Sequence, residues 1–300
     1  MKKIFIGNYK GGVGKTTSTL HIGLQLAKEH NKVLMIDLDP QCSLSDICIK
    51  ADSDFAGDLD NVPDMVTLNY VYDLETSNIE NEYNLNLRFT HTQPLNFREN
   101  LDFIPTKITY KENFSLDQLA MDLKPNIRYF SILSRFINDI ADKYKYDYVL
   151  IDCPPTSNVI TQSAFLYSDY YLIPTIADSI SAKGIAHYVE NINTLYDRYC
   201  VQGGESYFYK HYFGNRPKLI GVFYTLIRAQ ANYTNEKRNL EGQIPISDNG
   251  QAYIFTSHTD NYVEITRQIA RNAPEDTSTE KNSYPDITHE MLRRIDALSQ

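Results

Sequence analysis

The 300-residue chain contains 42% hydrophobic and 22% charged residues, which is the composition of an ordinary globular protein and excludes disorder throughout. Its 29 lysines and arginines are outnumbered by 38 acidic residues, so the net charge of −9 excludes a surface that is basic all over. No run approaches the roughly 20 apolar residues that a membrane-spanning helix needs. The four cysteines are too few and too unevenly spaced for a disulfide framework, and none forms a CxxC zinc pair. We therefore expect a cytoplasmic protein.

Short apolar runs alternate with helical stretches along the chain, which predicts βαβ units around a parallel sheet. The pattern predicts strands at 3–7, 32–37, 101–105, 147–152, 170–175 and 218–224, and helices near 14–29, 127–143, 157–167, 182–199 and 261–270. In the first helix, Leu20, Leu24 and Ala27 share one face. The expected fold is α/β, with a doubly wound, mostly parallel sheet flanked by helices in a single domain over residues 1–300.

Three segments depart from this alternation. Residues 39–122 carry 16 acidic and 5 basic residues, which predicts a solvated helix-and-loop insertion. Residues 272–286 are polar with two prolines, and we expect a flexible loop there before a terminal helix at 287–298. Residues 199–218 place six aromatic side chains among basic ones, where a short connection is expected. Such side chains stack on bases, hold a partner protein or pack onto their own domain, and we favour the packing.

Residues 10–17 read KGGVGKTT and lie between an apolar strand and an amphipathic helix. This context distinguishes a phosphate-binding loop from an ordinary tight turn. Glycines let successive N–H groups converge on an anion, and the helix N-terminus adds its positive end. Lys15 would supply a full positive charge, and Thr16 would place its hydroxyl on Mg²⁺. The usual P-loop pattern fails at its first position, where Tyr9 stands instead of glycine and Lys10 follows.

With Lys10 ahead of two glycines, the loop resembles the deviant Walker A motif of the ParA/MinD family of P-loop ATPases. Three further segments resemble that family in order. VLMIDLDPQCSLS at 33–45 is similar to its switch I segment, and YDYVLIDCPPTSNVIT at 146–161 is similar to its Walker B strand and switch II. SAFLYSDYYLIPTIADSISAKGIAHYVENI at 163–192 is similar to its next strand-helix unit. The resemblance covers most of residues 1–270 and is closest to ParA/Soj-type partition ATPases.

The resemblance implies an enzyme that hydrolyses ATP to ADP and phosphate with Mg²⁺, at a slow intrinsic rate. Lys10 would reach across a homodimer to the partner's phosphates, Lys15 would hold the β- and γ-phosphates, and Asp39 would position the attacking water. Thr16, Asp39 and Asp152 would serve the metal, with Asp37 a weaker candidate near the metal shell. The ATP-binding loop would comprise Lys10, Gly11, Gly12, Val13, Gly14, Lys15, Thr16 and Thr17.

The resemblance also implies that the ATP-bound dimer binds double-stranded DNA nonspecifically at the nucleoid, and that a ParB-like adaptor stimulates hydrolysis. Plasmid or chromosome partition is then the expected role. Residues 198–271 hold nine basic and six acidic residues, and the DNA-contact candidates are the basic ones at Arg228, Lys237, Arg238, Arg267 and Arg271. Residues 225–228 and 245–247 are the candidates for adenine contact. Because the chain starts directly at its first strand, we expect no N-terminal helix-turn-helix domain.

A MinD-like membrane-cycling or cargo-positioning ATPase is the alternative, since the terminal helix has one apolar face, formed by Ile287, Met291, Ile295 and Leu298. Glu290 and the shortness of this helix weaken it as an anchor for an anionic membrane. We expect it to pack onto its own domain, without stable membrane insertion. A second alternative is an interaction protein that binds ATP as a structural link and does not turn it over.

Overall fold

The computed structural model describes residues 1–51, 54–82, 92–111, 114–177, 179–227, 238, 240–242, 253–260 and 283–299. The strands are β1 (Lys2–Ile6), β2 (Val33–Asp37), β3 (Leu95–Arg98), β4 (Leu101–Ile104), β5 (Tyr148–Asp152), β6 (Tyr170–Ile176) and β7 (Lys218–Thr225). The α-helices are α1 (Lys15–Lys28), α2 (Ser43–Lys50), α3 (Leu68–Glu80), α4 (Leu116–Asp122), α5 (Ile127–Tyr144), α6 (Val159–Tyr167), α7 (Ser179–Tyr196), α8 (Ser206–Phe213) and α11 (Tyr284–Ser299). Short 3₁₀ turns occupy Leu59–Asn61 and Asp64–Val66, and a π-helical segment, Asp197–Gln202, continues α7.

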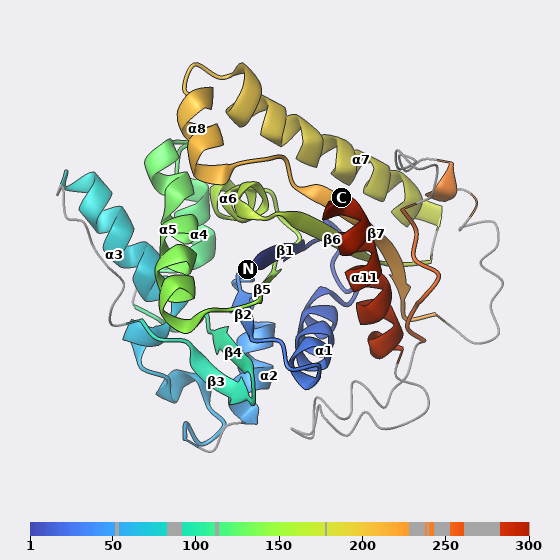
Figure 1. The fold of residues 1–300 in the computed structure, drawn as a ribbon. Helices are drawn as coiled ribbons and strands as arrows, with labels where there is room; N and C mark the ends of the chain where they lie inside the picture. Colours follow the sequence, from blue (N-terminus) through green and yellow to red (C-terminus); the bar gives the residue numbers. More distant parts are fainter. Residues whose placement is uncertain are drawn as a thin grey trace.

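The seven strands form one sheet in the order β3-β4-β2-β5-β1-β6-β7 (Figure 1). All neighbours are parallel except β3 and β4, which are antiparallel at one edge. The chain order of the strands reverses on either side of β1, so the sheet is doubly wound as the sequence predicts. In such sheets ligands bind beyond the carboxyl ends of the strands, where the winding reverses.

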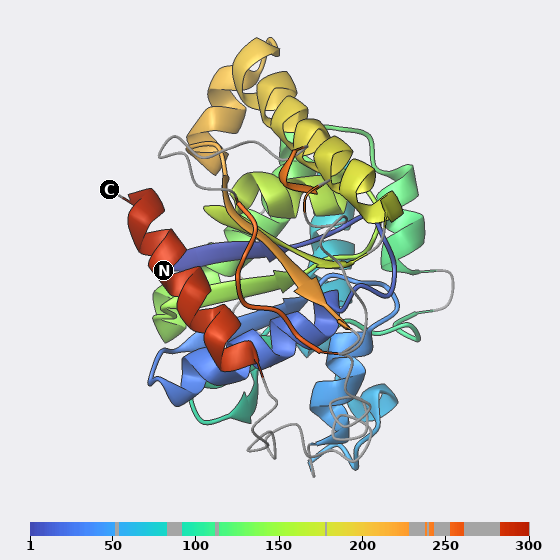
Figure 2. The same ribbon diagram turned by 90° about the vertical axis from the view of Figure 1, so that its right-hand side faces the viewer.

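Side chains of β1 alternate between two apolar cores, one on each face of the sheet. Ile4 and Ile6 belong to the core beneath α1, α2 and α11, whereas Phe5 belongs to the core beneath α3, α5, α6 and α7. Figures 1 and 2 show these two helical layers on opposite faces of the sheet. Because all three of these side chains are buried, the first strand is held from both sides at the centre of the fold.

The acidic region at 39–122 contains more regular structure than a helix-and-loop insertion. It includes α2, α3 and α4, and also the antiparallel pair β3 and β4. The strand expected at 101–105 is present as β4, whereas β3 has no counterpart in the sequence prediction. β3 pairs only at the sheet edge, and its four residues, LNFR, carry a single buried apolar side chain, Phe97. A strand this short and half-exposed leaves no clear periodicity in the sequence.

Helix α11 packs onto the domain through its apolar face. Ile287, Met291 and Ile295 are fully buried, and they lie in the same core as α1. Figure 2 shows α11 running alongside α1 and β7. The helix begins at Tyr284, within the stretch expected to be a loop, while most of that stretch and the helix expected at 261–270 lie outside the described residues. In the part of the chain that the structure describes, no helix is both long and apolar enough to cross a bilayer.

Residues 199–218 contain the end of the π-helical segment and α8, where the sequence predicts a short connection. The π-helical segment and α8 pack their inner side chains onto the domain, with Tyr209 and Phe213 buried beside Phe130. Their aromatic content is thus explained in part by core packing, as the sequence analysis favours. The outer face of α8 is different, because its aromatic side chains are exposed.

Glu290 on α11 fixes the segment that runs beside β7. Its carboxylate accepts the N–H groups of Thr256 and Ser257 at 3.1 and 3.0 Å, and it pairs with Arg294 at 2.9 Å. Burial alone would raise the pKa of Glu290, but the hydrogen bonds from Ser257, Thr256 and Arg294 outweigh it, and the pKa is lowered. The stability that Glu290 contributes is therefore present above the ordinary carboxyl pKa and is lost as pH falls.

We expect Glu290→Ala to lower the free energy of unfolding by about 2–3 kcal/mol, since it leaves two backbone N–H groups without their acceptor and removes the ion-pair partner of Arg294. Urea denaturation at neutral pH measures this change. Asp296→Ala on the same helix is the matched control, because the Asp296 side chain is 72% exposed, and it should change stability by less than about 0.5 kcal/mol. Equal effects of the two substitutions would contradict the assigned role of Glu290.

Candidate functional site

The KGGVGKTT loop follows β1 at the carboxyl edge of the sheet and leads into α1 at Lys15. Gly12 and Gly14 have φ of 70° and 80°, in the left-handed region that favours glycine over residues with a Cβ. Gly14 is the N-cap of α1, and neither a capping side chain nor an acidic residue occupies the first turn of that helix. The N–H groups at the start of α1 are thus available to an anion.

Two side chains from outside the loop fix its backbone. Thr225 at the end of β7 is buried, and its hydroxyl lies 2.9 Å from the Val13 carbonyl and 3.1 Å from that of Thr175. The buried Asn8 donates to the Pro174 carbonyl at 2.9 Å, and its side-chain oxygen accepts the N–H of Lys10 at 3.0 Å. Both contacts bind the loop to β6 and β7. No sequence motif marks Asn8, and Thr225 is predicted from the sequence only as part of the adenine-contact candidate 225–228.

Lys15 is buried against the loop that precedes it. Lys15 is only 7% exposed, and its Nζ donates a hydrogen bond to the carbonyl of Lys10 at 3.2 Å. Burial lowers the pKa of Lys15, while the nearby Asp152 and Asp39 oppose that change. Among the described residues no carboxylate forms a direct ion pair with the Lys15 ammonium. A negatively charged ligand bound beside it would therefore stabilise its charge. Thr16 and Thr17 lie half-buried in the first turn of α1.

Asp37 anchors the segment that carries Asp39. The fully buried Asp37 accepts the N–H and hydroxyl of Ser45 at 2.8 and 2.6 Å, and the N–H of Asp39 at 3.1 Å. The Ser45 hydroxyl in turn accepts the N–H of Thr106 at 2.9 Å. This network ties the ends of β2 and β4 to α2. Asp39 itself is half-buried, and its carboxylate accepts the N–H of Gln41 at 2.9 Å.

Asp152 ends β5 beside the start of α1 and directly across from Asp37 in the sheet register. Its Oδ1 accepts a hydrogen bond from Thr19 at 3.4 Å, and its fully buried Oδ2 has no hydrogen-bond partner among the residues that the structure describes. Burial and the neighbouring Asp37 raise the pKa of Asp152, whereas the Thr16 side chain lowers it through a hydrogen bond. A buried carboxylate oxygen left without a donor is suited to a cation or to a water bound to one.

These residues fit Mg²⁺ better than a transition metal. Mg²⁺ takes oxygen ligands and is usually held by one or two protein groups together with phosphate oxygens and water. Asp152 and Thr16 offer such oxygens next to the phosphate-binding loop. Within the described residues, no cluster of three or more histidine, cysteine or acidic side chains forms a separate metal cage. The four cysteines are buried and unpaired.

The stability that the Asp37 and Asp152 carboxyls contribute to the nucleotide-free protein should fall as pH rises from about 5 to about 8. Burial raises the pKa of Asp37 to about 7 and that of Asp152 above its ordinary value, so the folded state holds protons that the unfolded chain releases near pH 4. Thermal unfolding midpoints at the two pH values measure the fall. Asp152→Asn should reduce it, and Asp296→Asn, at an exposed position, should not. An unchanged fall in Asp152→Asn would contradict this origin.

The proposed DNA contacts lie largely outside the described residues. This holds for Arg228, Lys237, Arg267 and Arg271, and also for the adenine candidates at 245–247. Arg238 is described, and its side chain is exposed. The structure therefore places one of these five candidates at the surface.

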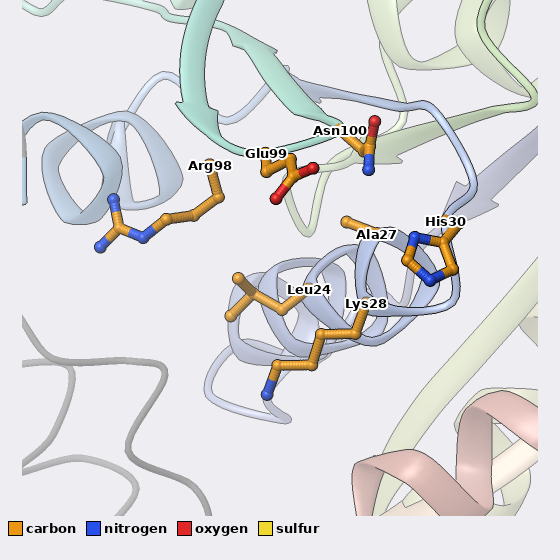
Figure 3. A pocket seen from close by; sticks show the side chains of 7 residues that line it. All are labelled: Leu24, Ala27, Lys28, His30, Arg98, Glu99 and Asn100. Atoms are coloured by element: carbon orange, nitrogen blue, oxygen red, sulfur yellow. The ribbon is translucent and has the colours of Figure 1, made fainter.

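A separate hollow of about 280 Å³ lies at the other end of α1, against the turn between β3 and β4 (Figure 3). Its lining includes Lys28 and His30 from the end of α1 and Arg98 and Glu99 from the turn. The length of α1 separates it from the phosphate-binding loop, so it is not part of the same site. Its lining carries both signs of charge and defines no preferred ligand.

A protein-family model described as an AAA domain matches residues 1–202. A ParA family protein of Chlamydia trachomatis is 32% identical over 199 residues, which are 65% of this chain and 67% of that protein. The sporulation initiation inhibitor protein Soj of Bacillus subtilis is 30% identical over 194 residues, 65% of this chain and 66% of Soj. An uncharacterized protein of Mycobacterium tuberculosis is 30% identical over 199 residues, and the match spans about half of its length, 54%.

Solved structures share the fold across the whole chain. A plasmid partition protein of Borrelia burgdorferi bound to AMPPNP superposes with a TM-score of 0.67 at 21% identity, covering 99% of both chains. Cobyrinic acid a,c-diamide synthase of Mycobacterium smegmatis, with ADP and magnesium, gives a TM-score of 0.62 at 19% identity, covering 99% of this chain and 96% of the synthase. At this sequence identity the similarity shows the fold alone. The fold occurs both in a partition protein and in a cobyrinic acid a,c-diamide synthase, so it does not by itself identify a function.

Proposed function

Because this chain belongs to the ParA family of P-loop ATPases, we propose that it binds and hydrolyses Mg-ATP and uses this cycle to partition DNA. The observation that carries the ATP site is the pairing of Lys15 with the open N-terminus of α1, beside the unpartnered buried oxygen of Asp152. A cationic cradle and a buried carboxylate oxygen without a donor at one sheet edge suit a phosphate chain and its cation.

The positions of the loop residues support the following roles. The N–H groups at the start of α1 and the Lys15 ammonium would hold the β- and γ-phosphates, and Thr16 and Asp152 would hold Mg²⁺, directly or through water. When bound, Mg²⁺ neutralises phosphate charge during transfer. The hydroxyl of Thr225 keeps the loop in shape by its contact with Val13, so the site is ordered before ATP enters.

Hydrolysis needs a water in line with the γ-phosphate, and we assign its orientation to Asp39, whose charge acts on the nearby Lys15. Asp37 holds the backbone of Asp39, while the Asp39 carboxylate accepts only the Gln41 N–H among the hydrogen bonds of the described residues. We expect slow turnover in the isolated protein, because orienting a water without a second cation near the γ-phosphate gives modest acceleration. Lys10 would supply that cation to the partner subunit in an ATP-bound homodimer.

The DNA step rests on the family and on the distribution of charge. A chain with a net charge of −9 contacts DNA only through local cations, among which we include the exposed Arg238. The ATP-bound dimer would then associate with the nucleoid in the cytoplasm, and a ParB-like partner would accelerate hydrolysis and release it. Helix α11 buries its apolar residues in the domain, which disfavours the membrane-cycling alternative.

Binding to a nonspecific DNA duplex, measured with ATP, with ADP and without nucleotide across a salt titration, tests this function. We expect binding with ATP alone, falling steeply as salt rises because phosphate contacts release counterions. Lys15→Ala serves as the nucleotide-binding control and should bind no DNA under any condition. If ATP is hydrolysed but DNA is not bound even at low salt, the partition role is wrong, and a cargo-positioning ATPase becomes the better description.

A further inference from the structure

The outer face of α8 is an exposed aromatic surface. Tyr207, Phe208 and Tyr212 are 77%, 56% and 46% exposed, and Val201 in the preceding π-helical segment is 57% exposed. The rings of Tyr207 and Phe208 are in contact, with centroids 5.9 Å apart, and we call these four exposed residues the α8 patch. Their exposure is not a consequence of a poorly packed helix, since Tyr209 on the opposite face is buried. Clustered aromatic side chains in water usually mark a contact site.

A recess of about 620 Å³ adjoins this patch at the amino edge of the sheet, the edge that faces the viewer in Figure 1. Tyr212 belongs to both, so the patch and the recess form one continuous surface. The recess is lined by the cations at the starts of β1 and β7, which are Lys2, Lys3, Arg216 and Lys218. Among the described lining residues Asp169 is the one acid, and Asp296 and Asp197 from outside the lining pair with Lys2 and Arg216. Lys218 is thus the lining cation without a carboxylate partner within the described residues.

Internal contacts already fix these cations in place. Lys2 pairs with Asp296 at 3.5 Å and Lys3 with Asp169 at 3.0 Å, while Arg216 pairs with Asp197 and donates to the Asn193 carbonyl. The ammonium of Lys218 donates to a carbonyl at the end of α11 at 2.5 Å, so within the described residues its charge is not neutralised by a carboxylate. A ligand would therefore meet oriented donors, which lowers the entropy cost of binding.

We propose that the α8 patch and the adjoining recess form a docking surface for a short acidic segment of a partner protein that carries aromatic or large apolar side chains. The apolar side chains of that segment would pack on Phe208 and Tyr212, and its carboxylates would enter the recess toward Lys218. The carboxylates of such a segment match the positive charge of Lys218 in the recess, and its apolar side chains match the aromatic side chains of the α8 patch. One segment would then contact both parts of the surface.

A nucleic acid fits this surface less well. Asp197 and Asp169 lie among the cations, and Glu205 precedes α8, so a continuous phosphate backbone would meet carboxylates along its path. A peptide can place its few acidic side chains only where cations are. The recess is also local, because its lining comes from the starts of β1, β6 and β7 and the end of α8, whereas a nucleic-acid strand follows a long groove.

The docking surface is separate from the proposed ATP site. The recess lies at the start of β1, whereas the phosphate-binding loop follows the end of that strand. β1 is five residues long, so the two sites are roughly 15 Å or more apart. The inference therefore does not rest on the proposed function, and a peptide should bind with and without nucleotide.

Selection of a random 12-residue peptide library, displayed on phage, against the full-length protein tests this proposal. Clones that also bind Phe208→Ser are removed. We expect the remaining clones to share an acidic sequence with at least one aromatic or large apolar residue. The best synthetic peptide should bind Phe208→Ser and Lys218→Glu at least tenfold more weakly than wild type in fluorescence anisotropy, and its affinity should fall as salt rises.

Met121→Ser and Lys124→Glu are the matched controls, because both side chains are exposed on another part of the surface and should leave the peptide affinity within twofold. Tyr207→Ser replaces Lys218→Glu if loss of the contact to α11 prevents folding. The proposal is overturned if no clone depends on Phe208, if the selected sequences are neutral or basic, or if duplex DNA binding, instead of peptide binding, is lost in both patch variants.

Discussion

Replacing Lys15 by alanine should weaken ATP binding at least a hundredfold. Lys15 is almost completely buried, and its ammonium makes one hydrogen bond among the described residues, to the Lys10 carbonyl, which leaves donors for phosphate oxygens. Removing a buried cation from a phosphate site leaves the ligand charge uncompensated, which typically costs about 2–5 kcal/mol. A loss of about 2.7 kcal/mol corresponds to a hundredfold change in affinity. Titration calorimetry with ATP and Mg²⁺ measures it.

Lys28→Ala is the matched control, since Lys28 is an exposed lysine at the opposite end of the same helix. It should leave ATP affinity unchanged. Lys15→Arg separates charge from shape, because the larger guanidinium keeps the charge but does not fit the buried space beside the loop. An ATP affinity of Lys15→Ala within threefold of wild type would remove Lys15 from the site, and with it the phosphate-binding assignment of the loop.

Replacing Asp39 by asparagine should slow ATP hydrolysis by about a hundredfold or more while leaving ATP affinity within about threefold. The substitution keeps the size of the side chain and an oxygen that can accept the Gln41 N–H. What it removes is the negative charge that orients and polarises the attacking water, an interaction needed in the transition state and not in the ground state. Phosphate release in a single turnover, together with a separate binding titration, distinguishes the two effects.

Asp46→Asn is the control for this experiment, because Asp46 is close by in α2 and its carboxylate pairs with Lys50 at the surface. It should leave hydrolysis unchanged. If Asp39→Asn hydrolyses ATP at the wild-type rate, another group must orient the water. If the wild-type protein itself binds ATP without any turnover, the site is a structural link between subunits and the enzymatic proposal is wrong.

The P-loop and the sheet around it could be predicted because local sequence determines them. KGGVGKTT needs its glycines for the positive φ at Gly12 and Gly14. The strands next to β1 in the sheet, β5 and β6, are nearly continuous apolar runs. The same holds for Asp152, which ends a fully buried strand and therefore had to lie at the carboxyl edge of the sheet. These features depend on few residues, all close together in the chain.

The supports of the site could not be predicted in this way, since they depend on contacts between distant segments. Thr225 bonds to Val13 across 212 positions of sequence, and Ser45 bonds to Thr106 across 61. A lone threonine or serine at the end of an element carries no periodic signal. The short strand β3 and the π-helical segment before α8 were missed for a related reason, because tertiary packing determines both.

The central position of β1 has a consequence for how the protein folds. The first strand pairs with β5 and β6, so Lys2 lies opposite Tyr148, and the partners of β1 are synthesised long after it. At the usual rates of translation this delay is roughly 7–30 s, during which an apolar strand emerges without its neighbours. A fold of such high contact order should refold slowly and benefit from chaperones that shield the nascent amino terminus.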